Sequence, residues 1–213
     1  MAEISSKNEI ATLILDFEVE PDKIQHLSEM ARQNIENVMS KKAGFISANI
    51  HESSSGTRLV NYSQWKNRES YYSAIDFLTK DEVLLGEKLL ELGQMKWDFF
   101  DITSSVGKIP THISIENGYP TGINIIEVDP KNSKKLIESI SEYATNVLPN
   151  QKGFVSANIH RSDDFRRVIN YVQWESFDGL DSLFNDTSAR DYYSSWKQIS
   201  DPVWNLFKVV YAI

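Results

Sequence analysis

Three side chains with hydrogen-bonding groups follow one another at short spacing in the first half of the chain: Asn61, Trp65 and Tyr71. Residues an even number of positions apart face the same side of an extended strand, so Asn61 and Trp65 point the same way. Tyr71 falls at the expected start of a helix that packs back over this face. A carboxamide, an indole N–H and a phenol directed at one volume predict an apolar pocket with a few polar groups, suited to a flat ligand.

The stretch that carries these residues occurs twice. GFISANIH, from Gly44, returns as GFVSANIH, from Gly153, and residues 44–65 align with 153–174 without a gap. Identical residues occupy 13 of the 22 aligned positions, at a constant offset of 109. Two copies are too few for a solenoid, so the duplication predicts two related domains.

The second copy keeps part of the polar set. Asn170 and Trp174 match Asn61 and Trp65, but Leu180 stands where the first copy has Tyr71. We therefore expect the complete set in the first half, and a set without its phenol in the second.

The same order of elements is expected in both copies. A β-rich segment is followed by an amphipathic helix, two strands joined by a polar hairpin, a helical region and a last strand. This βαββαβ order is the ferredoxin-like arrangement. Helices cover one face of such a sheet, and the other copy is the simplest cover for the opposite face. The sequence thus predicts an α+β fold in which two tandem ferredoxin-like domains pack sheet to sheet as a pseudo-dimeric α+β barrel.

Domain limits follow from the repeat and from the composition between the copies. We expect the first domain at residues 8–106 and the second at 122–213. Residues 107–121 carry two prolines and two glycines and are predicted to be the linker.

Composition excludes several classes of function. The net charge of −8 and the lack of a long basic cluster argue against nucleic-acid binding. The absence of cysteine excludes disulfides, thiolate metal sites and a cysteine nucleophile. No secretory signal and no apolar run long enough to span a bilayer is visible, so we expect no membrane association and a cytoplasmic location.

His51 and His160 match each other in the two copies. Strand alternation places them on one face with Phe45, Ser47 and Asn49 or the equivalent residues of the second copy. No pattern of metal-ligand spacing surrounds them, so we expect a structural or hydrogen-bonding role and no metal site.

The strings G-F-x-S-A-N-x-H and R-x-V-N-Y-x-Q-W resemble the antibiotic biosynthesis monooxygenase family in both halves of the chain. That resemblance implies dimeric α+β barrels, among them cofactor-free oxygenases that convert phenolic or anthrone-type polyketide intermediates to quinones. It also implies catalytic roles for Asn61, Trp65 and Tyr71, and substrate binding by Asn170 and Trp174. A family arginine that helps to bind substrate has no match that we can place.

The implied reaction uses dioxygen and a small aromatic substrate, with no metal, flavin or other cofactor. Hydrogen bonds in a dry pocket would favour the oxidisable phenolate, and Tyr71 would donate a proton to the resulting peroxide. The product would be a quinone of secondary metabolism.

Two other functions fit the same resemblance. Related barrels degrade haem with a histidine ligand on the helix after the tryptophan, but residues 66–96 and 175–197 contain no histidine. A non-catalytic ligand-binding or accessory protein, one that aids a cyclisation, is the main alternative to the oxygenase. The sequence leaves open the substrate, the activity of the second half and any further homodimer.

Overall fold

The computed structural model describes residues 2–6, 9–177, 180, 183 and 185–213. Its centre is a closed eight-stranded antiparallel barrel in the order β10-β3-β4-β2-β5-β8-β9-β7. The barrel strands are β2 (Ala11–Val19), β3 (Phe45–Ser53), β4 (Arg58–Trp65), β5 (Gly93–Gly107), β7 (Thr121–Val128), β8 (Phe154–Ser162), β9 (Arg167–Trp174) and β10 (Ser200–Ala212).

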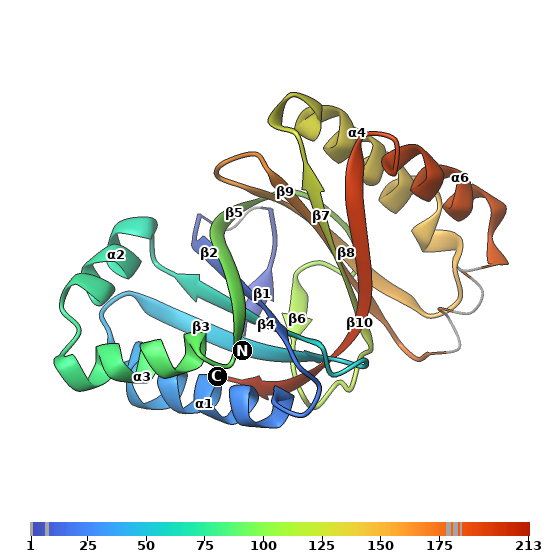
Figure 1. The fold of residues 1–213 in the computed structure, drawn as a ribbon. Coiled ribbons are helices and arrows are strands. Elements are labelled where there is room, and N and C mark those ends of the chain that lie inside the picture. Colours follow the sequence, from blue (N-terminus) through green and yellow to red (C-terminus); the bar gives the residue numbers. More distant parts are fainter. Residues whose placement is uncertain (1, 7–8, 178–179, 181–182, 184) are drawn as a thin grey trace.

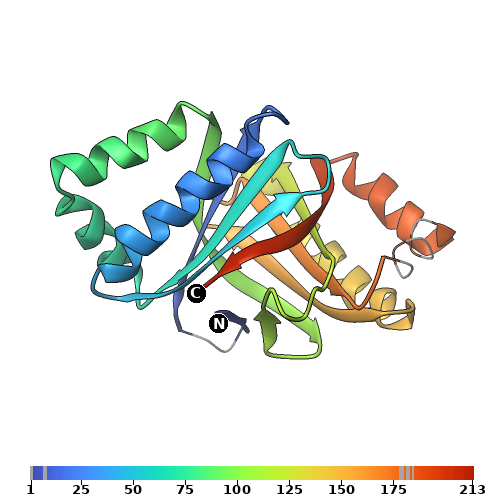
Figure 2. The same ribbon diagram turned by 90° about the horizontal axis from the view of Figure 1, so that it is seen from below.

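Helices lie against the outside of the barrel in two groups on opposite sides (Figures 1 and 2). The first half supplies α1 (Ile24–Asn37), α2 (Arg68–Asp76) and α3 (Lys80–Leu90), and the second supplies α4 (Pro130–Asn146) and α6 (Thr187–Trp196). Short 3₁₀ turns, Met39–Lys41 and Leu148–Asn150, follow α1 and α4. Among the described residues, apolar side chains form a layer between each helix group and its sheet. A further apolar layer made of strand residues lies inside the barrel.

Helix starts follow from local sequence. Thr79 and Glu82 form a capping box at the start of α3, so each side chain satisfies a backbone N–H that the helix leaves unpaired. Asp129 caps α4 through the N–H of Lys131, and Pro130 occupies the first turn, where its missing N–H costs nothing.

Strands β5 and β10 join the two halves into one sheet. Residues 93–100 of β5 pair with β2 of the first half, and residues 100–107 pair with β8 of the second. Strand β10 pairs in the same manner with β7 and with β3. The predicted α+β barrel of two tandem ferredoxin-like units is confirmed, and the two sheets are continuous through these long strands as well as facing each other.

A two-stranded ribbon closes one end of the barrel. Strand β1 (Ala2–Ile4) pairs with β6 (Thr111–Ile113), with Glu3 opposite His112. Gln64 Nε2 donates to the Glu3 carbonyl over 2.8 Å, and its repeat equivalent Gln173 donates to the His112 carbonyl over 3.0 Å. The repeat therefore extends to β1 and β6, and the predicted linker at residues 107–121 contains one of these strands.

The barrel interior holds a symmetric set of histidines and tyrosines. His51 Nε2 lies 3.0 Å from Tyr171 Oη, and His160 Nε2 lies 3.1 Å from Tyr62 Oη. Each hydrogen bond joins the first half to the second, as expected for a structural role. Phe45 does not share this face, contrary to the sequence interpretation, because a bulge after Phe45 shifts the alternation of β3.

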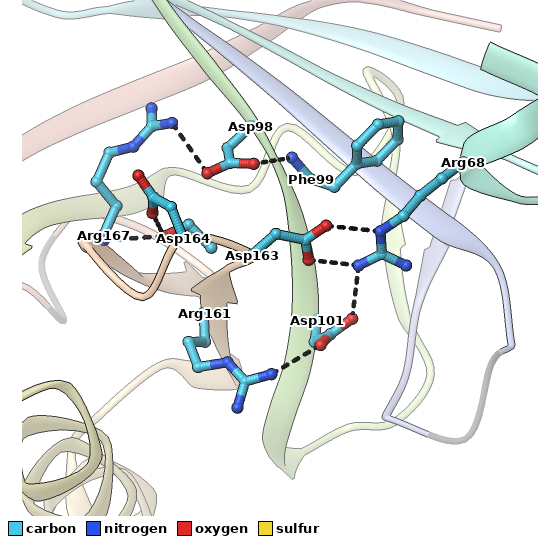
Figure 3. Close-up of polar contacts among 9 residues, drawn as sticks. Arg68, Asp98, Phe99, Asp101, Arg161, Asp163, Asp164 and Arg167 are labelled. Atoms are coloured by element: carbon cyan, nitrogen blue, oxygen red, sulfur yellow. Dashed lines mark hydrogen bonds and ion pairs between the residues drawn. The ribbon is translucent and has the colours of Figure 1, made fainter. Parts of the chain in front are cut away.

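An ion-pair network crosses between the halves on the barrel surface (Figure 3). Arg68 at the start of α2 donates from Nε to Asp163 in the β8–β9 hairpin over 2.7 Å. Asp101 of β5 accepts from Arg68 over 3.0 Å and from Arg161 over 2.8 Å.

Replacing Arg68 with alanine is expected to lower the free energy of unfolding by no more than about 1 kcal/mol, because exposed ion pairs are screened by water and salt. Urea denaturation at low and at high salt measures this effect. A loss above about 2 kcal/mol would show that the network holds the halves together.

Candidate functional site

Each half contains a cavity between its sheet and its helices. The cavity of the second half has a volume of about 340 Å³. It is lined by Gly122, Asn124, Tyr143, Leu148, Asn170, Val172, Trp174, Leu183, Ala189, Arg190, Tyr193, Trp196 and Trp204. The cavity of the first half has a volume of about 50 Å³. Its lining is Leu13, Leu15, Asn34, Ile35, Met39, Phe45, Ala48, Asn61, Ser63, Trp65 and Tyr71.

The two cavities occupy equivalent places in the repeat. The pairs at an offset of 109 that line both are Leu13 and Gly122, Leu15 and Asn124, Asn34 and Tyr143, Met39 and Leu148, Asn61 and Asn170, Ser63 and Val172, and Trp65 and Trp174. Drug-sized ligands occupy pockets of roughly 300–1,000 Å³. The second cavity lies within that range and the first lies well below it.

In the first half, the structure brings the three predicted residues together. Asn61 and Trp65 lie on one face of β4, and Tyr71 of α2 reaches the same cavity. The rings of Trp65 and Tyr71 meet edge to face at 5.3 Å, and Phe99 lies 5.5 Å from Tyr71. The cavity that Trp65 and Tyr71 line is, at about 50 Å³, too small for a drug-sized ligand.

Two polar atoms at this first cavity are buried without a partner among the described residues, Trp65 Nε1 and Asn61 Oδ1. They are a donor and an acceptor, as the sequence predicts. Burial raises the pKa of Tyr71 above its ordinary value, so its hydroxyl stays protonated at neutral pH. The group can therefore donate a proton to whatever the cavity holds.

In the second half, Asn170 and Trp174 both line the larger cavity, as their match to the first half predicts. Leu180 packs into the apolar core under α4 and does not appear on the cavity wall. Phenols reach this cavity from other positions, Tyr143 on α4 and Tyr193 on α6. Burial raises the pKa of Tyr143, so it too stays a neutral phenol.

The difference in volume follows from the residues at equivalent positions. Leu13 fills the space beside β2, and Gly122 leaves the same space beside β7 open. A Cβ built on Gly122 would approach Trp204 Nε1 to 3.4 Å, so the indole of Trp204 occupies part of the opening. Tyr71 lines the first cavity, but the equivalent residue of the second half is Leu180, so the second cavity lacks that ring.

Several wall residues of the second cavity carried no signal in the sequence. Asn124 is embedded in the apolar strand TGINIIEV and is 5% exposed. Trp196 and Trp204 provide aromatic walls, and the Trp196 indole donates to Ser139 Oγ over 2.9 Å. Arg190, an exposed residue of α6, also contributes to the lining. Because Leu15 lines the first cavity, the offset of 109 places its equivalent, Asn124, on the wall of the second cavity.

Among the described residues, no group of three or more histidine, aspartate or glutamate side chains is placed to hold a metal ion. The helices in the described part of the chain are all too short or too polar to cross a membrane.

Comparison with known proteins places the chain in a family. The antibiotic biosynthesis monooxygenase family matches residues 10–74 and 122–192, and the chain belongs to it. The tetracenomycin-F1 monooxygenase of Streptomyces glaucescens is 35% identical over 82 residues, which are 38% of this chain and 73% of that protein.

Solved structures show the same fold. An anthrone oxidase-like protein superposes with a TM-score of 0.83 at 16% identity, over 100% of this chain and 96% of that one. A major regulator of staphylococcal pathogenesis superposes with a TM-score of 0.56 at 8% identity, over 94% and 99% of the two chains. At these identities the likeness is one of fold.

Proposed function

We propose that this protein is a cofactor-independent monooxygenase that oxidises an aromatic, polyketide-like phenol or anthrone to a quinone with dioxygen, and that the substrate occupies the cavity of the second half. The observation that carries the proposal is this cavity, because it combines Asn170 and Trp174 with a volume suited to a fused aromatic molecule. The likeness to the tetracenomycin-F1 monooxygenase supports the reaction type.

The reaction balances without a further reductant. The ring CH₂ of an anthrone loses a proton to give the phenolate of the hydroxyanthracene tautomer. This phenolate transfers one electron to dioxygen. The resulting radical pair combines to form a C–O bond and a peroxide. Protonation of the outer peroxide oxygen, cleavage of the O–O bond and loss of the remaining C–H proton give the quinone carbonyl and one water. One dioxygen is consumed for each quinone formed.

The residues of the second cavity have distinct roles in this proposal. Trp174 and Asn170 hold the substrate oxygens, and the guanidinium of Arg190 favours the anionic form through its positive charge. Tyr143 is the phenol that protonates the peroxide in this proposal, because Leu180 has no hydroxyl and the Tyr193 hydroxyl already donates to the Pro202 carbonyl. The catalytic role for Asn61, Trp65 and Tyr71 that the sequence suggested is the competing prediction, and variants of the first half test it. We expect the enzyme to act in the cytoplasm as an intramolecular pseudo-dimer.

Oxygen uptake by metal-stripped protein, with a panel of anthrones and hydroxynaphthalenes, tests this function. We expect one dioxygen per quinone, and a loss of at least about ten-fold in Trp174→Phe, because a lost hydrogen-bond donor typically costs 10²–10³ in rate. The matched first-half variants Trp65→Phe and Tyr71→Phe should retain activity. The reverse pattern would place the chemistry in the first half.

The second candidate function is a non-catalytic ligand-binding or accessory protein. The observation that favours it is the absence of a phenol at Leu180, where the first half has Tyr71. The fold also occurs in a regulator of staphylococcal pathogenesis, so the fold does not by itself specify catalysis. Tight binding of the aromatic panel with no oxygen uptake would select this function.

A further inference from the structure

Two carboxamides lie side by side on the sheet wall of the second cavity. Asn124 of β7 and Asn170 of β9 are directly opposite each other in the antiparallel register. Both line the cavity, and they are 5% and 4% exposed. The Oδ1 atom of each has no hydrogen-bond partner among the described residues.

Buried amides without partners are costly. An unsatisfied buried polar group costs about 1–3 kcal/mol, so two of them on one wall require an explanation. The fold does not need the second amide, because the first half has Leu15 opposite Asn61 at the equivalent place. Asn124 therefore distinguishes the open cavity from the filled one, and a ligand in the open cavity can supply the partner that its amide lacks.

The rest of the wall indicates the shape of that ligand. Trp174, Trp196 and Trp204 present ring surfaces, which favour a flat, fused aromatic molecule. Side chains directly opposite each other in an antiparallel pair lie about 5 Å apart, so the two amides can contact two substituents on a single ring edge. Two hydroxyl groups that flank a ring ketone have this kind of spacing.

Carboxamides suit oxygen substituents whose hydrogen-bonding role changes. The torsion that turns an Asn amide is soft, and a half-turn exchanges its acceptor oxygen for its NH₂ donors. Such a group can accept from a phenol and donate to a phenolate or a carbonyl. It therefore fits both the substrate and the quinone product of an oxidation.

We propose that Asn124 and Asn170 together recognise one edge of a fused aromatic ring system that carries two oxygen substituents, and that Asn124 is the residue that determines this specificity. The inference rests on the proposed function for the choice of an aromatic ligand. It adds that a ring system with fewer than two hydroxyl groups beside the ring ketone on that edge is a poor ligand.

Binding of non-reacting anthraquinones tests the inference. The probes are anthraquinone, 1-hydroxyanthraquinone and 1,8-dihydroxyanthraquinone, and the signal is tryptophan fluorescence, since three indoles line the cavity. We expect the wild-type protein to bind the dihydroxy compound at least about ten-fold more tightly than the parent. In Asn124→Leu this preference should fall about ten-fold, with the affinity for the parent changed less than about two-fold.

Two further variants keep the test decisive. Leu15→Asn makes the reciprocal change in the first half and should leave the preference unaltered, and Asn124→Ala replaces Asn124→Leu if the latter does not fold. An unchanged preference in a folded Asn124 variant, or no preference in the wild type, overturns the inference. Oxygen uptake with 1,8-dihydroxyanthrone, which carries the recognised edge, is measured in parallel. Uptake without an edge preference overturns this inference alone, and an edge preference without uptake overturns only the oxygenase.

Discussion

Replacing Gly122 with leucine is expected to reduce the oxidation of an anthrone by at least about 100-fold, equivalent to about 2.7 kcal/mol, because the substrate no longer fits. Even the first added carbon would lie 3.4 Å from Trp204 Nε1, and the remaining carbons extend into the cavity. The first half shows the result of this side chain, since Leu13 at the equivalent position lies beside a cavity of only about 50 Å³. Single-turnover kinetics and ligand titration measure the loss.

The reciprocal variant is the matched control. Leu13→Gly should leave turnover unchanged while lowering stability by at least about 2–5 kcal/mol, the usual cost of replacing a buried leucine with alanine, to which the freedom of glycine adds. Full activity in a folded Gly122→Leu protein would contradict the assignment of the second cavity as the substrate site. Activity that increases in Leu13→Gly would point to the first.

Stability is expected to fall steeply between pH 6.5 and pH 4, with the two interior histidines as a main cause. Complete burial lowers the pKa of His51 and of His160 to about 4 from the ordinary 6.5. Between these values the unfolded chain binds protons that the folded chain does not, so stability is lost as the pH falls. Each imidazole should remove about 3 kcal/mol by pH 4, and little further below it.

Urea denaturation at several pH values, in the wild type and in the double variant His51→Gln, His160→Gln, measures this contribution. Glutamine retains a group that can bond to Tyr171 or Tyr62 but does not titrate, so the double variant should lose much of the pH dependence. His26→Gln, at an exposed position, is the control and should behave as the wild type. Equal slopes in all three proteins would mean that the interior imidazoles do not govern acid unfolding.

Much of the architecture could be predicted from the repeat. The offset of 109 fixes two equivalent units, and period-two alternation correctly places Asn61 with Trp65 and Asn170 with Trp174 on cavity walls. Such predictions succeed where a strand has one face toward a helix layer, because burial then constrains every second residue.

The rest depends on features that alternation does not reveal. A single extra residue in β3 moves Phe45 to the other face, and three-residue strands such as β1 and β6 are too short to show a period. Which cavity is open depends on volumes contributed by distant segments, as for Gly122 on β7 and Trp204 on β10. A role for the Asn124 amide in ligand binding can be inferred only once Asn170 is known to lie opposite it on the neighbouring strand.

The sharing of β5 and β10 between the halves has a consequence for how the two copies can evolve. In a barrel assembled from two identical chains, every substitution appears at both equivalent positions. Here one chain carries both copies, so Leu13 and Gly122 can differ, while the closed sheet still requires the strands of each half. The need for barrel closure would preserve the first copy although its cavity is small, and it would leave the walls of the second cavity free to change.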